Sequence, residues 1–167
     1  MDENEFDAFY NASYRRVCAQ VYAMIGDFDE AAECVQEAFA RAWAHRRKMS
    51  SVDYPEAWIR TTAYRLAVGR WRRKKYASRA TDRAVGARTE MPAVDETHVA
   101  LVEALKKLPE VQRQAIVLHH IADLPVHQVA TEVGAPTGTI KARLARGRAT
   151  LAELLAEETP GAVWKEA

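Results

Sequence analysis

Apolar residues recur every three or four positions along most of the chain, and no segment keeps the strict alternation that is typical of a β-strand. The first apolar face extends over residues 5–25, and Gly26 is expected to end that helix. A second helix follows, with Asp27 or Asp29 as its N-terminal cap, and it continues to the basic residues 46–48. The pattern therefore predicts two consecutive helices joined by a short turn.

A third helix is predicted to begin at Pro55, after a short loop over residues 50–54, because proline is well tolerated in the first helical turn. Its apolar stripe is expected to consist of Trp58, Thr62, Leu66 and Trp71. On this interpretation both tryptophans pack in the core, although an indole ring can also stack on a nucleic-acid base.

The periodicity stops after the third helix. Residues 77–96 contain Gly86 and Pro92 and few large apolar side chains, which is typical of a linker. We predict that this linker is flexible and that trypsin cuts it first. The chain would then consist of two small domains, residues 1–76 and residues 97–167.

Helical periodicity returns in residues 99–108, and further helices are expected in residues 109–121 and in a short segment after Pro125. Gly134 is expected to make a turn before a last long helix that begins at residues 136–137. A short helix, a glycine turn and a second helix have the layout of a helix-turn-helix. The predicted fold class is all-α, with two small helical domains joined by a flexible linker and a helix-turn-helix in the second domain.

The nearly balanced net charge of +1 conceals two basic segments. Residues 60–88 hold ten basic residues and a single acidic one, Asp82, and residues 137–150 hold four basic residues and no acidic one. Both segments interrupt an otherwise acidic chain, so they indicate two contacts with a polyanion such as DNA. A solvated helix face is the alternative interpretation of each charge run.

The segment 124–151 carries the most specific motif. Ala130 lies where the two helices of a helix-turn-helix cross at close range, which leaves no space for a larger side chain. We expect base contacts from the face opposite Ile140 and Leu144, and phosphate contacts from the helix start and the flanks. The base-reading face would consist of Lys141, Ala142, Ala145 and Arg146. Phosphate contacts are expected from Thr137, Thr139, Arg143 and Arg148.

Two parts of the chain together resemble one known family. The run over residues 108–151 resembles the C-terminal promoter-binding domain of extracytoplasmic-function (ECF) sigma factors of bacterial RNA polymerase, which belong to the sigma-70 family. Residues 29–39 look like the core-polymerase-binding helix of that family. Residues 55–59 and 70–73 look like its promoter-melting helix. The matching segments occur in the expected order, with a linker between them.

This resemblance implies a sigma factor that directs promoter-specific initiation by binding core polymerase and the −10 and −35 promoter elements. The implied partners are promoter DNA, a coiled coil of the largest polymerase subunit, the flap of the second-largest subunit and an anti-sigma factor. The residues implied in core-polymerase binding are Asp29, Glu33, Gln36, Glu37 and Arg41. Those implied at the −10 element are Ser50, Ser51, Val52, Asp53, Tyr54, Arg60, Arg65, Arg70, Arg72 and Arg73. The residues implied at the −35 element are those of the helix-turn-helix given above.

Two other function classes compete with a sigma factor. A helix-turn-helix regulator that does not act as a polymerase subunit would have a sensory or dimerising N-terminal lobe. An enzyme of nucleic-acid metabolism would need acidic metal ligands or a nucleophile near its basic surface, and residues 60–88 offer only Asp82. The sequence therefore favours the sigma factor.

The remaining residues indicate no further chemistry. Cys18 and Cys34 lack the CxxC spacing of a zinc site, and the adjacent His119 and His120 point about 100° apart on a helix. We therefore expect no metal, no cofactor and no enzymatic activity. The acidic residues 1–5 do not resemble a signal peptide, and no apolar run is long enough to insert into a membrane. A cytoplasmic protein is expected.

Overall fold

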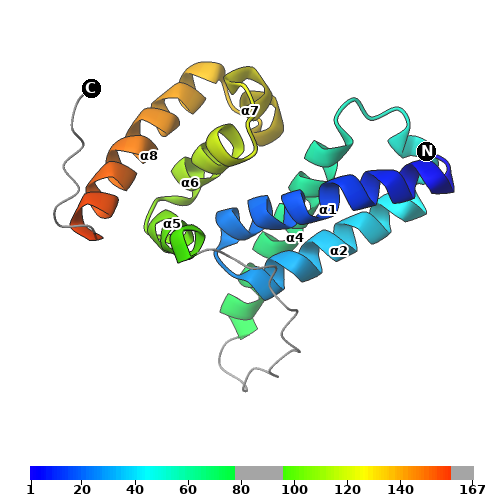
Figure 1. Cartoon of the computed structure of the whole chain (residues 1–167), viewed down its shortest axis with the longest axis horizontal. Coiled ribbons are helices and arrows are strands. Elements are labelled where there is room, and N and C mark those ends of the chain that lie inside the picture. The colour runs from blue at the N-terminus through cyan, green and yellow to red at the C-terminus, as the bar shows by residue number, and fades with distance from the viewer. Residues whose placement is uncertain (78–95, 159–167) are drawn as a thin grey trace. The chain divides into compact units, whose positions relative to one another are not determined.

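The computed structural model describes residues 1–77 and 96–158, and the chain divides into two compact units, Met1–Val94 and Asp95–Ala167. Helices, turns and short loops make up all of the described residues, with no strand among them (Figure 1). The prediction of an all-α fold with two helical domains is confirmed. Nearly all of the predicted linker, residues 78–95, lies outside the described residues. The predictions of its flexibility and of its early cleavage by trypsin concern these same residues.

Over its described residues, 1–77, the first unit consists of three long helices and one short one. These are α1 (Glu3–Ile25), α2 (Phe28–Ala44), α3 (Arg46–Met49) and α4 (Pro55–Ala77). Helix α4 packs against both α1 and α2, and α1 also packs against α2 (Figure 1). The three long helices therefore enclose one hydrophobic core.

Local signals in the sequence account for the ends of α1 and α2. Asp2 and Glu5 each accept a hydrogen bond from the backbone N–H of the other, at 2.8 Å, and this capping box starts α1. Gly26 ends α1 in the left-handed conformation, with φ of 76°. The Asp27 carboxylate then accepts from the backbone N–H of Glu30 at 3.1 Å and caps α2. Of the two predicted caps, Asp27 is therefore the one used.

The apolar stripe predicted for α4 is wrong. The residues of this helix that enter the core are Ile59, Ala63 and Ala67, which are 0%, 0% and 5% exposed. Trp58 is only half-buried, and Trp71 is 60% exposed, so Trp71 does not pack in the core as predicted. Small alanine side chains let α4 approach its neighbours closely, and a stripe of large residues would hold the helices apart.

The second unit also consists of helices. They are α5 (Glu96–Lys106), α6 (Glu110–Ile116), a π-helical turn η1 (Val117–Ile121), α7 (Val126–Val133) and α8 (Thr137–Glu158). The turn η1 continues directly from α6, and the backbone N–H of Ala122 donates to the carbonyl of Val117 at 2.9 Å. This i to i+5 bond fits one extra residue into the last turn, which periodicity in the sequence does not predict.

The helix-turn-helix is formed by α7 and α8, as predicted. Gly134 makes the turn in the left-handed conformation, with φ of 71°, and its backbone N–H donates to the carbonyl of Ala130 at 2.9 Å. Ala130 is 7% exposed, and Ile140 and Leu144 are 0% and 1% exposed. The buried side of α8 is thereby defined, and the opposite side of its first turns faces solvent.

Helix α8 packs closely against α6 at Gly147, a contact that the sequence gives no sign of. A Cβ atom on Gly147 would lie 2.8 Å from Cγ1 of Ile116 and 3.6 Å from Cβ of Gln112. A Cβ on Gly69 of α4, in contrast, would meet nothing within 4 Å. Gly147 therefore serves close packing, and Gly69 does not.

These two glycines make a matched pair for measuring stability. Gly147→Ala should lower the free energy of unfolding by about 1–3 kcal/mol, because Ile116 has to move. Gly69→Ala should raise the free energy of unfolding by about 0.5–1 kcal/mol, because alanine loses less backbone entropy in a helix. Urea unfolding followed by circular dichroism at 222 nm measures both. Equal effects of the two substitutions would contradict the close contact at Gly147.

Candidate nucleic-acid and protein interfaces

The outward side of α2 carries the residues that the sequence implicates in protein binding. Asp29, Glu33, Gln36 and Arg41 are exposed, and Glu37 is partly exposed. A guanidinium nitrogen of Arg41 donates to Glu37 at 2.5 Å. This hydrogen bond holds the pKa of the Glu37 carboxyl below its usual value, so the group is ionised at neutral pH. The five side chains thus form one polar face, which is open to a partner.

Arg70 turns toward this face of α2. Its Nη1 lies 2.9 Å from Oε2 of Glu33 and 3.5 Å from Oε1 of Glu30, and its Nη2 lies 2.8 Å from Oε2 of Glu37. One turn further along α4, Lys74 Nζ lies 3.3 Å from Oε2 of Glu30. The structure therefore joins Arg70, predicted as a DNA contact, to the predicted polymerase-binding carboxylates.

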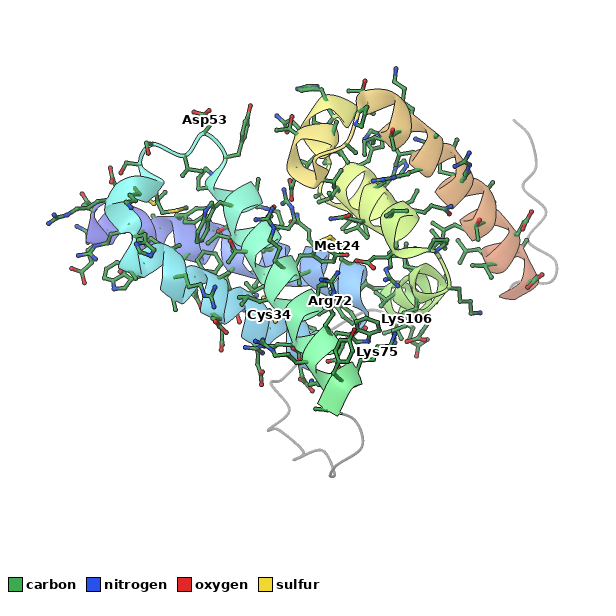
Figure 2. All side chains as sticks on the ribbon, turned by 180° about the vertical axis from the view of Figure 1, so that it is seen from behind. Met24, Cys34, Asp53, Arg72, Lys75 and Lys106 are labelled. Atoms are coloured by element: carbon green, nitrogen blue, oxygen red, sulfur yellow. The ribbon has the colours of Figure 1, made fainter. Side chains whose placement is uncertain are left out.

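Cys34 lies beneath this group of charges, at the place where α2 meets α4 (Figure 2). It is 0% exposed, and its thiol is 3.8 Å from Oε1 of Glu30. Burial raises the pKa of the Cys34 thiol to about 11, so the thiol keeps its proton at neutral pH. Cys18 is buried as well. Both cysteines therefore pack as small apolar residues.

Arg60, which the sequence analysis assigns to the −10 DNA, is buried in the structure. Its side chain is 2% exposed, and its Nη1 donates to Oε1 of Gln20, itself 2% exposed, at 2.8 Å. Arg60 follows the buried Ile59 directly, and its guanidinium reaches Gln20 of α1 inside the first unit. Arg60 therefore belongs to the core and is withheld from any DNA surface.

The other predicted −10 residues are accessible. Ser50, Ser51, Asp53 and Tyr54 are exposed and Val52 is half-buried, all in the loop before α4. Arg65, Arg72 and Arg73 are exposed along α4.

Asp53 lies at one end of α4 and Arg72 and Lys75 at the other (Figure 2). The Nζ of Lys75 also lies 5.1 Å from the centre of the Trp71 ring. The loop and this helix therefore present a row of cations together with the exposed aromatic rings of Tyr54, Trp71 and Tyr76.

Most of the predicted base-reading residues of α8 are exposed, whereas Ile140 and Leu144 of the same helix are buried. Lys141, Ala145 and Arg146 are exposed, as are Thr137 and Arg148, and Thr139, Ala142 and Arg143 are half-buried. Arg148 differs from the others because its Nε donates to Nε2 of His120 at 3.1 Å. Burial, assisted by His119 and Arg148, lowers the pKa of His120, so its ring is neutral and can accept this bond. His120 thereby orients Arg148, a contact that the sequence did not indicate.

His119 has a structural partner, because its Nδ1 lies 2.7 Å from the carbonyl oxygen of Leu124. Over residues 1–77 and 96–158 no group of histidine, cysteine, aspartate and glutamate side chains converges as metal ligands would.

Within the same residues, no helix is both long enough and apolar enough to cross a membrane.

Two solved structures share this fold. The structure of the sigma factor RpoE from Bartonella quintana, in complex with the anti-sigma factor NepR, matches 93% of this chain and 99% of its own, with a TM-score of 0.72 and 23% identity. The structure of CnrH in complex with the cytosolic domain of CnrY matches 95% of this chain and 92% of its own, with a TM-score of 0.68 and 18% identity.

Family models match the two units separately. Residues 9–76 match Sigma-70 region 2, and residues 98–151 match Sigma-70, region 4. The first segment lies in the unit with the acidic and basic faces, and the second contains the helix-turn-helix. The two regions together define a transcription initiation factor of the sigma-70 class.

Curated relatives narrow this class to one family. The chain is 32% identical over 161 residues to the ECF RNA polymerase sigma factor SigK of Mycobacterium sp. (strain KMS), covering 87% of this chain and 80% of the relative. It is 27% identical over 152 residues to SigK of Mycobacterium tuberculosis (strain ATCC 25618 / H37Rv), covering 86% and 81%. The chain therefore belongs to the ECF family of RNA polymerase sigma factors, which direct promoter-specific initiation of transcription. The family and the function indicated by the sequence are confirmed, and a regulator that does not act as a polymerase subunit is not favoured.

The buried position of Arg60 has a measurable consequence. Arg60→Ala should lower the free energy of unfolding by about 2–3 kcal/mol, because Gln20 loses a charged hydrogen-bond donor inside the core. Arg65→Ala, on the exposed side of the same helix, should change that free energy by less than about 0.5 kcal/mol. Urea unfolding followed by tryptophan fluorescence suits this comparison, since three of the four tryptophans, Trp43, Trp58 and Trp71, lie in the first unit. Equal stability of the two variants would show that the bond between Arg60 and Gln20 contributes little.

Proposed function

We propose that this sigma factor uses separate surfaces for its main contacts: the polar face of α2 for the coiled coil of core polymerase, the loop and cations of α4 for the −10 element, and the start of α8 for the −35 element. The observation that carries this proposal is the position of Ala145 and Arg146, exposed on the side of α8 away from the buried Ile140 and Leu144, with Lys141 exposed at the edge of that side. In a helix-turn-helix, this part of the second helix enters the major groove.

At the −35 element, the proposed base contacts come from Lys141 and Arg146. Their long cationic side chains can donate to O6 and N7 of guanine, and Ala142 and Ala145 can contact the methyl group of thymine. Arg148 has its Nε committed to His120, so we assign it to a phosphate. Thr137, Thr139 and Arg143 would contact the DNA backbone near the start and flank of the helix.

At the −10 element, the proposed base-capture site is the loop over residues 50–54. A single extruded base needs only a stacking surface and a few edge contacts, and Tyr54 is 61% exposed in this loop. Arg65, Arg72 and Arg73 supply cations for the backbone of the DNA. Trp71 is 60% exposed among these cations, so its ring is available for stacking on an unpaired base.

The proposed polymerase contacts are Asp29, Glu33, Gln36, Glu37 and Arg41. A mostly acidic, exposed helix face complements a basic partner, which we take to be the coiled coil of the largest subunit. For the flap of the second-largest subunit, we propose the second unit, where Val99, Val111 and Leu155 are 39%, 45% and 40% exposed.

An anti-sigma factor is a further proposed partner, since the solved structures of RpoE and CnrH are complexes with NepR and with the cytosolic domain of CnrY. Such a partner would compete for the surfaces described above. We propose that the protein acts in the cytoplasm and has no catalytic activity of its own.

Run-off transcription tests the proposed function directly. Core polymerase with this protein should initiate at a subset of genomic promoters, and core polymerase alone should not. The variant Glu37→Lys reverses a charge on the proposed docking face and should reduce initiation at least tenfold. Initiation by the pair at the level of core alone, or full activity of Glu37→Lys, would contradict the proposal.

Binding titrations test the division between base and phosphate contacts on α8. Lys141→Ala and Arg146→Ala should each weaken binding to the cognate promoter by about 1–3 kcal/mol and relax the preference at one base pair. Arg148→Ala is the matched control, which should weaken binding to all sequences and reduce the salt slope by about one. The measurement uses a panel of single-base promoter changes at two salt concentrations. If all three variants behave alike, the assignment of the reading face is wrong.

A further inference from the structure

The cations of α4 do not all face the same way. Residues seven apart on a helix lie on nearly the same side, so Arg65 and Arg72 share one face. Arg70 precedes Arg72 by two residues and therefore points about 160° away from it. Lys74 follows Arg70 by one turn, and both reach glutamates of α2. The helix thus carries two cationic faces, one open to solvent and one directed toward α2.

The face directed toward α2 meets a row of carboxylates. Glu30, Glu33 and Glu37 are spaced three and four residues apart, so they lie on one side of α2 and repel one another. The planar guanidinium of Arg70 places Nη1 on Glu33 at 2.9 Å and Nη2 on Glu37 at 2.8 Å. A guanidinium presents its donors in a rigid fork, so one side chain holds two carboxylates at a defined separation.

The bond from Arg70 leaves acceptor capacity on Glu33. Arg70 engages Oε2 of Glu33, and Glu33 is 64% exposed, so its other oxygen is open to a donor from a partner. Without Arg70, Glu33 would be a long, exposed side chain with several rotamers. Fixing a side chain before association removes an entropy cost from binding.

We propose that Arg70 is a positioning residue of the polymerase-docking surface, where it holds Glu33 and Glu37 in the arrangement that polymerase contacts. Arg70 is therefore not a DNA contact. This inference rests on the proposed function of the α2 face. It adds a positioning residue from α4 to a surface that the sequence assigns to α2 alone.

The first experiment compares Arg70→Ala with Arg72→Gln, a cation on the opposite side of the same helix. Arg70→Ala should weaken the affinity for core polymerase about tenfold and leave the salt slope of −10 DNA binding by the saturated holoenzyme unchanged. Arg72→Gln should leave the core affinity unchanged and reduce that slope by about one. Tighter core binding by Arg70→Ala would mean that Arg70 competes with polymerase, and unchanged core binding with a smaller slope would make Arg70 a DNA contact. Either result overturns the proposal.

A double-mutant cycle separates positioning from general stability. Glu33→Gln should weaken the affinity for core polymerase. The double variant with Arg70→Ala should lose less affinity than the product of the two single fold-losses, because both changes break the same contact. Arg70→Lys should restore part of the affinity, since an ammonium can neutralise the carboxylates but cannot fork between two of them. Strictly multiplicative effects, or full rescue by lysine, would contradict the proposal.

Two controls keep the result interpretable. Thermal unfolding of each variant checks that the first unit is folded at the assay temperature, and Arg70→Gln replaces Arg70→Ala if the alanine variant is unfolded. Glu37→Gln tests the docking face independently of Arg70. If Glu37→Gln binds core polymerase as the unmodified protein does, the proposed function of α2 fails. If Glu37→Gln binds weakly and Arg70→Ala binds normally, only the role of Arg70 is refuted.

Discussion

The close packing of α4 against α1 and α2 determines the rest of the first unit. Ile59, Ala63 and Ala67 enter the core, and the small side chains of the two alanines let the three helices approach one another closely. Once this side of α4 is buried, its rotation about its own axis is set. That rotation sends Arg60 into the core and Arg70 toward α2, and it leaves Trp71 in solvent. The rotation set by this packing thus places three residues of one helix in three different environments.

The second unit follows the same physical rule with different residues. Gly147 lets α8 lie against α6, and Ala130 lies at the close crossing of the helix-turn-helix. With Ile140 and Leu144 buried, the opposite side of α8 is left for a partner. A sigma factor must keep such a surface rigid, because a base contact in the major groove requires side chains placed to within a fraction of an ångström. Dense packing beneath the helix supplies that rigidity.

The packing of the helices also separates acidic from basic side chains on the surface. The chain is nearly neutral overall, yet it offers an acidic face on α2 and cations on α4 and α8. Arg70 and Lys74 offset the carboxylates of α2 and thereby moderate their mutual repulsion. Arg65, Arg72 and Arg73 stay exposed on the same helix. One small unit can therefore serve a protein partner and a nucleic acid, because opposite charges are separated by rotation around α4.

The amino-acid sequence by itself determined the long helices, the end of the first at Gly26, a choice between Asp27 and Asp29 for the next cap, the turn at Gly134 and the family, because these depend on local propensity and on residues in fixed spacing. It also predicted the exposed side of α8, where Ile140 and Leu144 mark the opposite face. Tertiary structure alone decided the rotation of α4, the π-helical turn and the close contact at Gly147. Charge runs show which residues are basic, but only packing against α1 and α2 decides that Arg60 is buried and that Arg70 binds glutamates. The physical reason is that small alanine and glycine side chains, which give almost no signal in a hydrophobic pattern, control how closely helices approach.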